Sequence, residues 1–287
     1  MAEKSVVVGV DGSSSATAAV RWAAREARRR GVALSVVHAC LLVPARVPDP
    51  IALPRTYHEA VLEQGRRWLA EAAEEARRVA PDLAVETELA SGDAAEDLVG
   101  RSASAQLVVL GSRGLGGFTG LLVGSIAVAV ATHGHCPVVV VRGAETGSGV
   151  VVGVDGSAAG EAALAFAFAQ AAATSAELVA VRTWSDVFVD TAWHQGLVVD
   201  WEPIEAAERE LLERQVEPHR AAHPDVAVRL VVTRDRPAHA LVAHSRDAAL
   251  VVVGSRGRGG FRGLLLGSTS QALIHHAECP VVVVPHH

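Results

Sequence analysis

The chain has 287 residues, half of them hydrophobic, and a formal net charge of −6. This length predicts about two domains of ordinary size, each able to bury a core of its own. Charged residues make up 20% of the chain without a basic run, which argues against disorder and against nucleic acid as the main partner, because phosphate-backbone binding needs clustered Lys or Arg.

Three motifs occur twice along the chain. The first recurs after 144 residues, and the other two recur after 143 residues. The chain therefore consists of two copies of one unit, with predicted domains at 1–143 and 149–287 and a polar, Gly-rich linker between them. The motif pairs are Val6–Ser13 and Val150–Ser157, Gly111–Ser125 and Gly254–Ser268, and His135–Val141 and Glu278–Val284.

The first copy alternates apolar, β-branched runs with helical patterns. Its first helix is expected to end at Gly31, after a cluster of arginines, and its long second helix to end before Pro81. The segment 41–56 carries four prolines, which predicts a loop. The predicted strands are Ser5–Val10, Ala33–Ala39, Ala84–Leu89, Gln106–Leu110 and Pro137–Val141, and the predicted helices are Ser15–Arg30, Tyr57–Val79, Ala94–Ser102 and Ser125–Thr132.

The second copy repeats this order, with a long predicted loop over Trp184–Pro203. Strands separated by helices imply right-handed crossovers, so we expect an α/β fold with two tandem copies of a five-stranded, mainly parallel sheet flanked by helices. Ligands of such sheets bind at the carboxyl ends of the strands, where the strand order reverses. The predicted strands of this copy are Val150–Val154, Glu177–Thr183, Val226–Val232, Leu250–Val253 and Pro280–Val284.

Each copy carries a glycine loop between a strand and a helix, with the spacing Gly-x₂-Gly-x₉-Gly-Ser. In the first copy the spaced residues are Gly111, Gly114, Gly124 and Ser125. Glycines let the backbone approach a ligand closely, and the start of a helix directs free N–H groups and positive dipole toward the loop. The pattern predicts a phosphate site, and the alternative is a tight turn without a ligand. The second copy has Gly254, Gly257, Gly267 and Ser268.

The loop is not a Walker A loop, because it lacks Gly-x₄-Gly-Lys-[Ser/Thr] and Lys4 is the only lysine of the chain. Arg113 and Arg256 are the cations that both loops share. Each either offsets phosphate charge or lies solvated on the loop. Ser125 and Ser268 either donate to phosphate or cap the helix, and the two roles are compatible.

An aspartate directly follows the first strand of each copy, as Asp11 and Asp155. Its carboxylate is placed to accept a hydrogen bond from a ribose hydroxyl or to help hold Mg²⁺, and the alternative is an Asx-turn or a helix cap. Because this aspartate and the glycine loop both follow strand ends, we expect them to meet at one crevice.

The three cysteines predict neither a disulfide framework nor a zinc site, because their number is odd and no Cys-x-x-Cys pair occurs. The first residues lead straight into a predicted strand, without a signal peptide. No apolar run reaches membrane-spanning length. We therefore expect a cytoplasmic protein without a membrane partner.

Two clusters of histidine and cysteine suggest a metal site. Their spacing differs between the copies, so we predict structural or surface roles and no metal ligand. The sequence shows no Gly-x-Ser-x-Gly elbow and no positioned Ser, His and acid set, so we predict no catalytic residue. The clusters are His133, His135 and Cys136 in the first copy, and His275, His276 and Cys279 in the second.

With these motifs the chain resembles the universal stress protein family in its tandem two-domain form. The resemblance covers Ser5 to Val284 and rests on Val8-Gly-Val-Asp-Gly-Ser13, the glycine loop and the Cys-Pro-Val-Val-Val-Val strand, all recurring. In the ATP-binding branch of the family the loop holds the phosphates and ribose, the aspartate lies by the nucleoside, and the backbone after strand two meets adenine. The resemblance also implies a Rossmann-like fold of the adenine nucleotide alpha hydrolase type.

Pairing of the two copies through their fifth strands, as an internal pseudo-dimer, is a further implication, and a homodimer of chains stays open. Carried over residue by residue, the resemblance implies an adenine nucleotide site in each copy, with ATP and Mg²⁺ as the ligand. The predicted binding residues are Val10, Asp11, Ala39, Gly111, Arg113, Gly114, Gly124, Ser125 and Ile126 in the first copy, and Val154, Asp155, Thr183, Gly254, Arg256, Gly257, Gly267, Ser268 and Thr269 in the second.

These features favour a stress-response regulator that binds ATP at two sites per chain, meets unidentified protein partners and turns ATP over slowly at most. One alternative is a nucleotide-free scaffold whose glycine loops only shape an interaction face. Another is an adenylyl-transfer enzyme, but such enzymes carry Ser-Gly-Gly-x-Asp-Ser where this chain has Asp11-Gly-Ser-Ser-Ser15. The copies also differ where Arg234–Pro237 replaces Ser91–Ala94, a difference that would make the two sites unequal.

Overall fold

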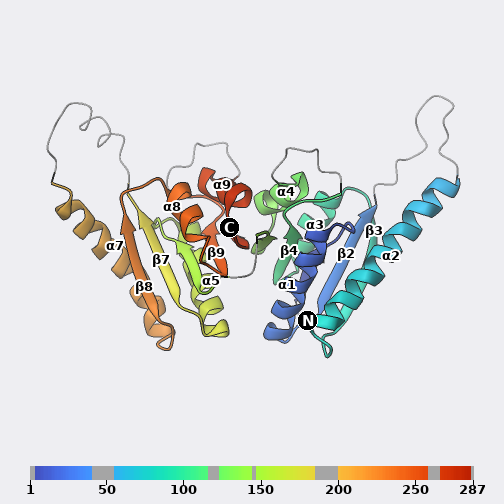
Figure 1. The fold of residues 1–287 in the computed structure, drawn as a ribbon, viewed down its shortest axis with the longest axis horizontal. Helices are drawn as coiled ribbons and strands as arrows, with labels where there is room; N and C mark the ends of the chain where they lie inside the picture. The colour runs from blue at the N-terminus through green and yellow to red at the C-terminus, as the bar shows by residue number, and fades with distance from the viewer. Residues whose placement is uncertain are drawn as a thin grey trace, which may run out of the picture. The chain divides into compact units, whose positions relative to one another are not determined.

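A computed structural model of the chain shows the α/β class that the sequence predicts (Figure 1). The chain divides into two compact units, Met1–Arg142 and Gly143–His287. Within the described part of the chain, each unit has five strands and four helices. The described residues are 4–40, 55–115, 123–143, 147–184, 200–257 and 266–285.

The first unit alternates strands and helices as expected, and each predicted element is present with its ends shifted by two residues at most. The predicted proline-rich loop lies outside the described residues except for its last two positions, which already belong to the long helix. The elements are β1 (Val6–Gly9), α1 (Ser14–Arg30), β2 (Leu34–Cys40), α2 (Arg55–Val79), β3 (Val85–Ser91), α3 (Ala94–Ser102), β4 (Leu107–Gly111), α4 (Ser125–His133) and β5 (Val138–Val141).

The five strands of the first unit form a parallel sheet in the order β3-β2-β1-β4-β5. In the register, Val6 of β1 pairs with Leu34 of β2 on one side and with Leu107 of β4 on the other. The chain thus builds the sheet outward from β1 to β3 and then returns to the other side of β1. The strand order reverses between β1 and β4.

Helices cover both faces of this sheet. Right-handed crossovers that run in opposite directions along the sheet place α1 and α2 on one face and α3 and α4 on the other, and the two members of each pair contact each other. The central strands are buried on both faces, with Val8 of β1 and Val109 of β4 fully inaccessible to solvent. This double burial explains why they consist of continuous β-branched residues without a polar alternation.

The second unit has the same plan, with the parallel order β10-β9-β6-β7-β8. Helices α5 and α7 contact each other, and so do α8 and α9. The register again aligns the first and second strands from their first residues, with Val150 opposite Leu178. The elements are β6 (Val150–Gly153), α5 (Ala158–Thr174), β7 (Leu178–Thr183), α7 (Glu202–Ala222), β8 (Val228–Thr233), α8 (Pro237–His244), β9 (Leu250–Gly254), α9 (Ser268–His276) and β10 (Val281–Val284).

The predicted loop Trp184–Pro203 is too long by two residues at its C-terminal end. Residues 185–199 lie outside the described part of the chain, but α7 begins at Glu202 and includes Pro203 in its first turn. Proline is accepted there because the first N–H groups of a helix have no intrahelical partner to lose. A proline therefore marks a helix start here, whereas the sequence analysis took it as the end of a loop.

The ends of α1 show how local sequence sets an element. Ser13 is the N-cap, and its Oγ accepts a hydrogen bond from the N–H of Ala16 at 3.1 Å. At the other end Gly31 adopts a left-handed conformation with φ of 68° and its N–H donates to the carbonyl groups of the last turn. Both ends of this helix are therefore set by capping residues that can be recognised in the sequence.

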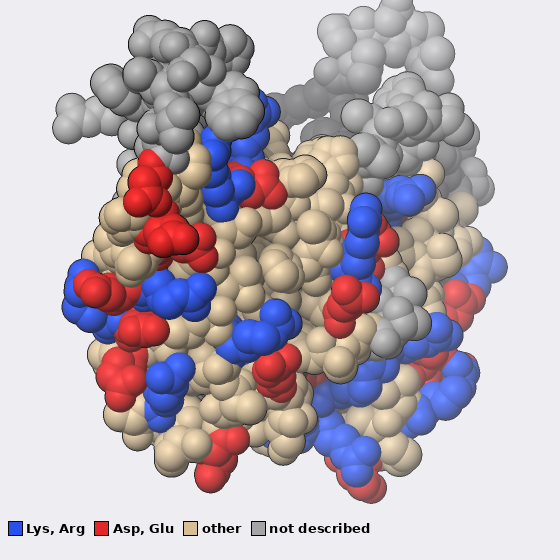
Figure 2. Space-filling model, turned by 60° about the vertical axis from the view of Figure 1, so that its left-hand side comes forward, with Lys and Arg blue, Asp and Glu red and all other residues tan. Residues whose placement is uncertain are grey.

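Charged side chains of both signs are interspersed on the face shown in Figure 2. Many are ion pairs within one element, such as Glu205 with Arg209 and Glu210 with Arg214 on α7. Pairs of this exposed kind contribute little to stability, and their alternation leaves no strong single-sign field on this face. Among the described residues, no helix combines the length and apolar composition that crossing a membrane requires.

Two left-handed glycines of the first unit allow a matched test of the packing around β1. Gly12 has φ of 83°, and a Cβ there would lie 2.2 Å from Nε1 of Trp68 on α2. Gly31 has φ of 68° with open space around its Cβ direction. Gly31→Ala is expected to lower the free energy of unfolding by about 1–2 kcal/mol, the strain of a left-handed L-residue.

Gly12→Ala is expected to cost about 1–3 kcal/mol more than Gly31→Ala, because Trp68 must also move. Urea unfolding of both variants, followed by circular dichroism, measures the difference. Equal losses in the two variants would contradict the tight contact between the turn after β1 and α2.

Candidate functional site

Each unit has a cavity at the carboxyl ends of its central strands. In the first unit the chain leaves the neighbouring strands β1 and β4 toward opposite faces, through α1 and α4, so the strand ends diverge. The cavity there has a volume of about 450 Å³, and the cavity at the ends of β6 and β9 in the second unit has about 490 Å³. Cavities of this size accommodate small-molecule ligands.

All the residues predicted from the sequence lie at these two cavities, although their contact with a nucleotide stays a prediction. In the first unit they come from the ends of three strands and from the start of α4, which only the fold brings together. The first cavity is lined by Val10, Asp11, Ala39, Gly111, Arg113, Gly114, Gly124, Ser125 and Ile126. The second is lined by Val154, Asp155, Thr183, Gly254, Arg256, Gly257, Gly267, Ser268 and Thr269.

Asp11 joins the turn after β1 to the glycine loop after β4. Its Oδ1 accepts a hydrogen bond from the N–H of Ser13 at 3.0 Å, and its Oδ2 accepts one from the N–H of Leu115 at 2.8 Å. The first bond is the Asx-turn that the sequence analysis kept as an alternative. The second confirms that the aspartate and the glycine loop meet at one crevice.

The glycines of the loop are required by close approaches of the main chain. A Cβ on Gly114 would lie 2.5 Å from Oδ2 of Asp11, which lies on the neighbouring strand end. A Cβ on Gly111 would lie 2.6 Å from the backbone of Ser15 at the start of α1. A side chain at Gly114 would push the loop away from the end of β1, and one at Gly111 would push it away from the start of α1.

Two serine hydroxyls add to this contact in the first unit. Ser13 Oγ donates to the carbonyl of Arg113 at 3.2 Å, and Ser15 Oγ accepts from the N–H of Arg113 at 3.2 Å. The second unit keeps the first of these bonds more weakly, with Ser157 Oγ at 3.4 Å from the carbonyl of Arg256. It lacks the second, because Ala159 replaces the serine.

Asp155 occupies the position of Asp11 in the second unit. Its Oδ1 accepts hydrogen bonds from the N–H of Ser157 at 2.9 Å and from Oγ of Ser157 at 2.7 Å. A Cβ on Gly257 would lie 2.5 Å from its Oδ2, the same close approach as in the first unit. Both cavities therefore have a carboxylate against the start of the glycine loop.

The start of α4 is set by glycine and not by serine. Gly124 is the N-cap in extended conformation, without a side-chain cap, and Gly267 has the same role at α9. Ser125 and Ser268 are the first helical residues, so the alternative that they are N-caps is wrong. With no capping side chain, the first-turn N–H groups of Ser125, Ile126 and Ala127 are directed into the cavity that these residues line.

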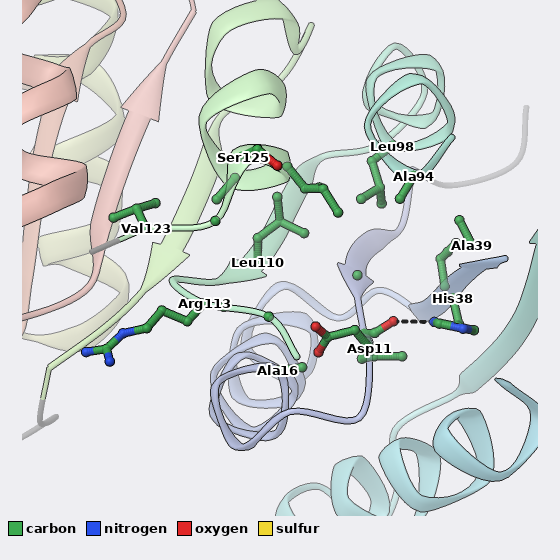
Figure 3. Close-up of a pocket in the computed structure, with 18 residues that line it drawn as sticks. Asp11, Ala16, His38, Ala39, Ala94, Leu98, Leu110, Arg113, Val123 and Ser125 are labelled. Atoms are coloured by element: carbon green, nitrogen blue, oxygen red, sulfur yellow. Dashed lines mark hydrogen bonds between the residues drawn. The ribbon is translucent and has the colours of Figure 1, made fainter. Parts of the chain in front are cut away.

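His38 of β2 is a cavity residue that the sequence analysis did not find. Its Nδ1 lies 2.7 Å from the carbonyl oxygen of Val10, so Nδ1 must carry the proton, because a carbonyl only accepts. The ring is buried and meets Trp68 edge-on, with centroids 5.1 Å apart. Figure 3 shows it beside Ala39, on the side of the cavity opposite Ser125. No local motif marks this histidine, since its role depends on the register of β2.

Arg182 takes the place of His38 in the second unit but does not line the cavity. This buried guanidinium forms an ion pair with Glu208 of α7 and donates from Nη1 to Oε1 of Gln215 at 3.2 Å. Other lining residues missed from the sequence are apolar side chains such as Leu98 of α3 and Leu241 of α8. Their helical spacing is that of any core helix, so the sequence held no signal for them.

The two arginines predicted to offset phosphate charge have side chains that are exposed to solvent. The Arg113 side chain extends away from Asp11 and Ser125 in Figure 3, and both Arg113 and Arg256 are exposed to solvent. This arrangement matches the alternative of a solvated loop arginine. The positive groups that face the cavity are therefore mainly backbone N–H groups.

The cysteines near the predicted histidine clusters are buried. Burial raises the pKa of the Cys136 thiol to about 11, so the thiol stays protonated at neutral pH, and Cys279 is also buried. A metal ligand would need the thiolate. Within the described ranges, no group of three or more His, Cys, Asp or Glu side chains is placed to hold a metal ion.

The contact between Asp11 and the glycine loop can be tested by amide hydrogen exchange. Asp11→Ala removes the acceptor of the Leu115 N–H, and hydrogen bonds to a charged group contribute roughly 1.5–3 kcal/mol. We expect exchange of the Leu115 amide to become faster by about tenfold or more, as measured by NMR.

Asp93→Ala is the matched control. Asp93 Oδ1 also accepts two backbone N–H groups, from Ala95 at 2.8 Å and Glu96 at 3.0 Å, but both belong to the start of α3. Exchange at Leu115 should not change in this variant. Unchanged Leu115 exchange in Asp11→Ala would show that another contact holds the loop.

The chain is similar to known proteins of one family. The model of the Universal stress protein family matches residues 3–142 and 149–285. Universal stress protein Rv2623 of Mycobacterium tuberculosis is 38% identical over 290 residues, covering 97% of this chain and 95% of that protein. Universal stress protein Rv2005c of the same organism is 39% identical over 287 residues, covering 97% and 96%.

A crystal structure of a universal stress protein from Archaeoglobus fulgidus has a similar fold, with a TM-score of 0.74. The superposition covers 99% of this chain and 97% of that chain at 20% identity. Two family-model matches in tandem and relatives aligned over nearly the full length lead to one conclusion: the chain belongs to the universal stress protein family.

Proposed function

We propose that this chain binds an adenine nucleotide, ATP with Mg²⁺, in the cavity of each unit and acts as a cytoplasmic stress-response regulator. The observation that carries the proposal is the assembly of the family's nucleotide motif around a cavity of suitable size in both units. Family membership supports the same conclusion. Occupancy by nucleotide would then change how the protein contacts its protein partners.

The phosphates would bind at the starts of α4 and α9. Ser125 and Ser268 line the cavities there, and their hydroxyl groups and the first-turn N–H groups would bind phosphate, because a helix start favours anions. Lys4, the only lysine, precedes β1 and is not a cavity residue. The proposed phosphate site therefore depends on backbone donors held in place by the glycine contacts.

The nucleoside would bind between the ends of β1 and β2. Ala39 and Val37 line the first cavity there, and Thr183 and Val181 line the second. Both Asp11 oxygens already accept one N–H each, and each carboxylate oxygen has a second lone pair. These lone pairs are available for a ribose hydroxyl, which supports the predicted place of the sugar.

The residues present fit a Mg²⁺ ion that is held mainly by the nucleotide. Asp11 and Asp155 are the carboxylates that line the described cavities. Mg²⁺ commonly binds through one or two carboxylates together with phosphates and water. The ion would neutralise phosphate charge, and a single aspartate in each cavity is enough to contact its water shell.

The titratable groups at the cavities favour binding over catalysis. Among the described lining residues they are Asp11, His38 and Arg113 in the first unit, and Asp155 and Arg256 in the second. The aspartates are engaged with backbone N–H groups, and His38 donates to Val10. A general base must reach the proton that it removes, and in this proposal the remaining lone pairs of the aspartates accept from the ribose. Turnover of bound ATP would therefore be slow.

Equilibrium dialysis with ATP and Mg²⁺ tests the proposal. The intact chain should bind two equivalents of nucleotide, and Gly114→Ala and Gly257→Ala should each remove one. The added methyl group would lie 2.5 Å from the aspartate oxygen of its own unit and displace the loop from its phosphate-binding position.

Gly100→Ala is the control, because its Cβ would point into open space on α3. This variant should keep both equivalents. Absence of ATP binding by the intact chain at millimolar nucleotide would overturn the proposed function. Two equivalents bound by the Gly114→Ala, Gly257→Ala double variant would place the nucleotide elsewhere on the chain.

A further inference from the structure

The two cavities have the same backbone arrangement but different side chains in the first turn of α4 and of α9, where the phosphates are proposed to bind. Helix α4 begins with Ser125-Ile-Ala127, whereas α9 begins with Ser268-Thr-Ser270. Ile126 and Thr269 both occupy the second helical position after a glycine N-cap, and both line their cavity. At this matched position the first cavity has an apolar side chain and the second has a hydroxyl group.

The third helical position differs in a way that affects rigidity. Ser270 is buried, and its Oγ lies 2.9 Å from the carbonyl oxygen of Gly267 and 3.2 Å from that of Ser255, just after β9. Ala127 has no hydroxyl group to make this contact in the first unit. Both helix starts are joined to the strand end by a main-chain bond, from Gly124 N–H to the carbonyl of Ser112 at 2.9 Å and from Gly267 N–H to that of Ser255 at 2.8 Å. The Ser270 hydroxyl adds a side-chain contact in the second unit, which lowers the cost of ordering that helix start around a ligand.

An exposed apolar side chain lies at the helix start of the first cavity. Ile126, one of the lining residues, is 40% exposed. An apolar side chain offers a phosphate no hydrogen bond and displaces water that would solvate it. A chain of several phosphates would therefore be stabilised less here than in the second unit.

We propose that the two sites differ in how strongly they select for phosphate-chain length. Both units bind ATP, but the second prefers ATP over AMP more strongly than the first. This inference rests on the proposed function, and it deepens that function by giving the two sites different selectivity.

Calorimetric titration of single-site variants tests the inference. The Gly114→Ala chain reports on the second site and the Gly257→Ala chain on the first, each titrated with AMP and with ATP plus Mg²⁺. The ratio of ATP affinity to AMP affinity should be larger at the second site by about tenfold, the value of one added hydrogen bond to a charged group.

Exchange of the matched side chains identifies the cause. Thr269→Val keeps the shape of the side chain but removes the hydroxyl, and it should weaken ATP binding at the second site about tenfold while changing AMP binding by less than about twofold. Thr269→Ser should restore ATP binding. Ile126→Thr should raise the ratio at the first site. Circular dichroism establishes that each variant is folded.

The outcomes separate the two proposals. Equal ratios at the two sites, with both nucleotides bound, would overturn phosphate selection and leave the proposed function standing. Unequal ratios that Thr269→Val and Ile126→Thr leave unchanged would also overturn the assignment to these side chains. Failure of both nucleotides to bind at either site would overturn the proposed function, and the inference would fall with it.

Discussion

The carboxylate of Asp11 is the contact on which the first site depends, and Asp155 has the same position in the second unit. One oxygen of Asp11 closes the turn after β1, and the other accepts the N–H of Leu115 in the glycine loop. The loop comes this close only because Gly114 has no Cβ, which would lie 2.5 Å from that oxygen. Strand end, turn and helix start are thereby held around one cavity.

A site built from main-chain groups has a consequence for the evolution of its side chains. The N–H groups at the starts of α4 and α9 are present whatever residues follow the N-cap glycine. Side chains at the cavity wall can therefore differ while these N–H groups keep their positions. The two units illustrate this, since Ile126 and Thr269 occupy equivalent backbone positions with opposite polarity.

The order and type of the elements could be predicted because the signals are local. Continuous β-branched runs mark strands buried on both faces, and Ser13 and Gly31 mark the two ends of α1. The prediction failed where one residue type is compatible with two local structures. Pro203 was placed in a loop but lies in the first turn of α7, and Ser125 was offered as an N-cap although Gly124 has that role.

The sequence by itself determined the repeat of one unit, the α/β class and the motif residues at each cavity, because repeated motifs and strand-ending glycines can be identified without knowing the fold. Only the tertiary structure decided which polar side chains lie at the cavity and how they are oriented. It directs Arg113 away from Asp11 and brings His38 to the carbonyl of Val10, while the equivalent Arg182 pairs with Glu208. These side chains are oriented by neighbours distant in sequence, and no local pattern encodes such contacts.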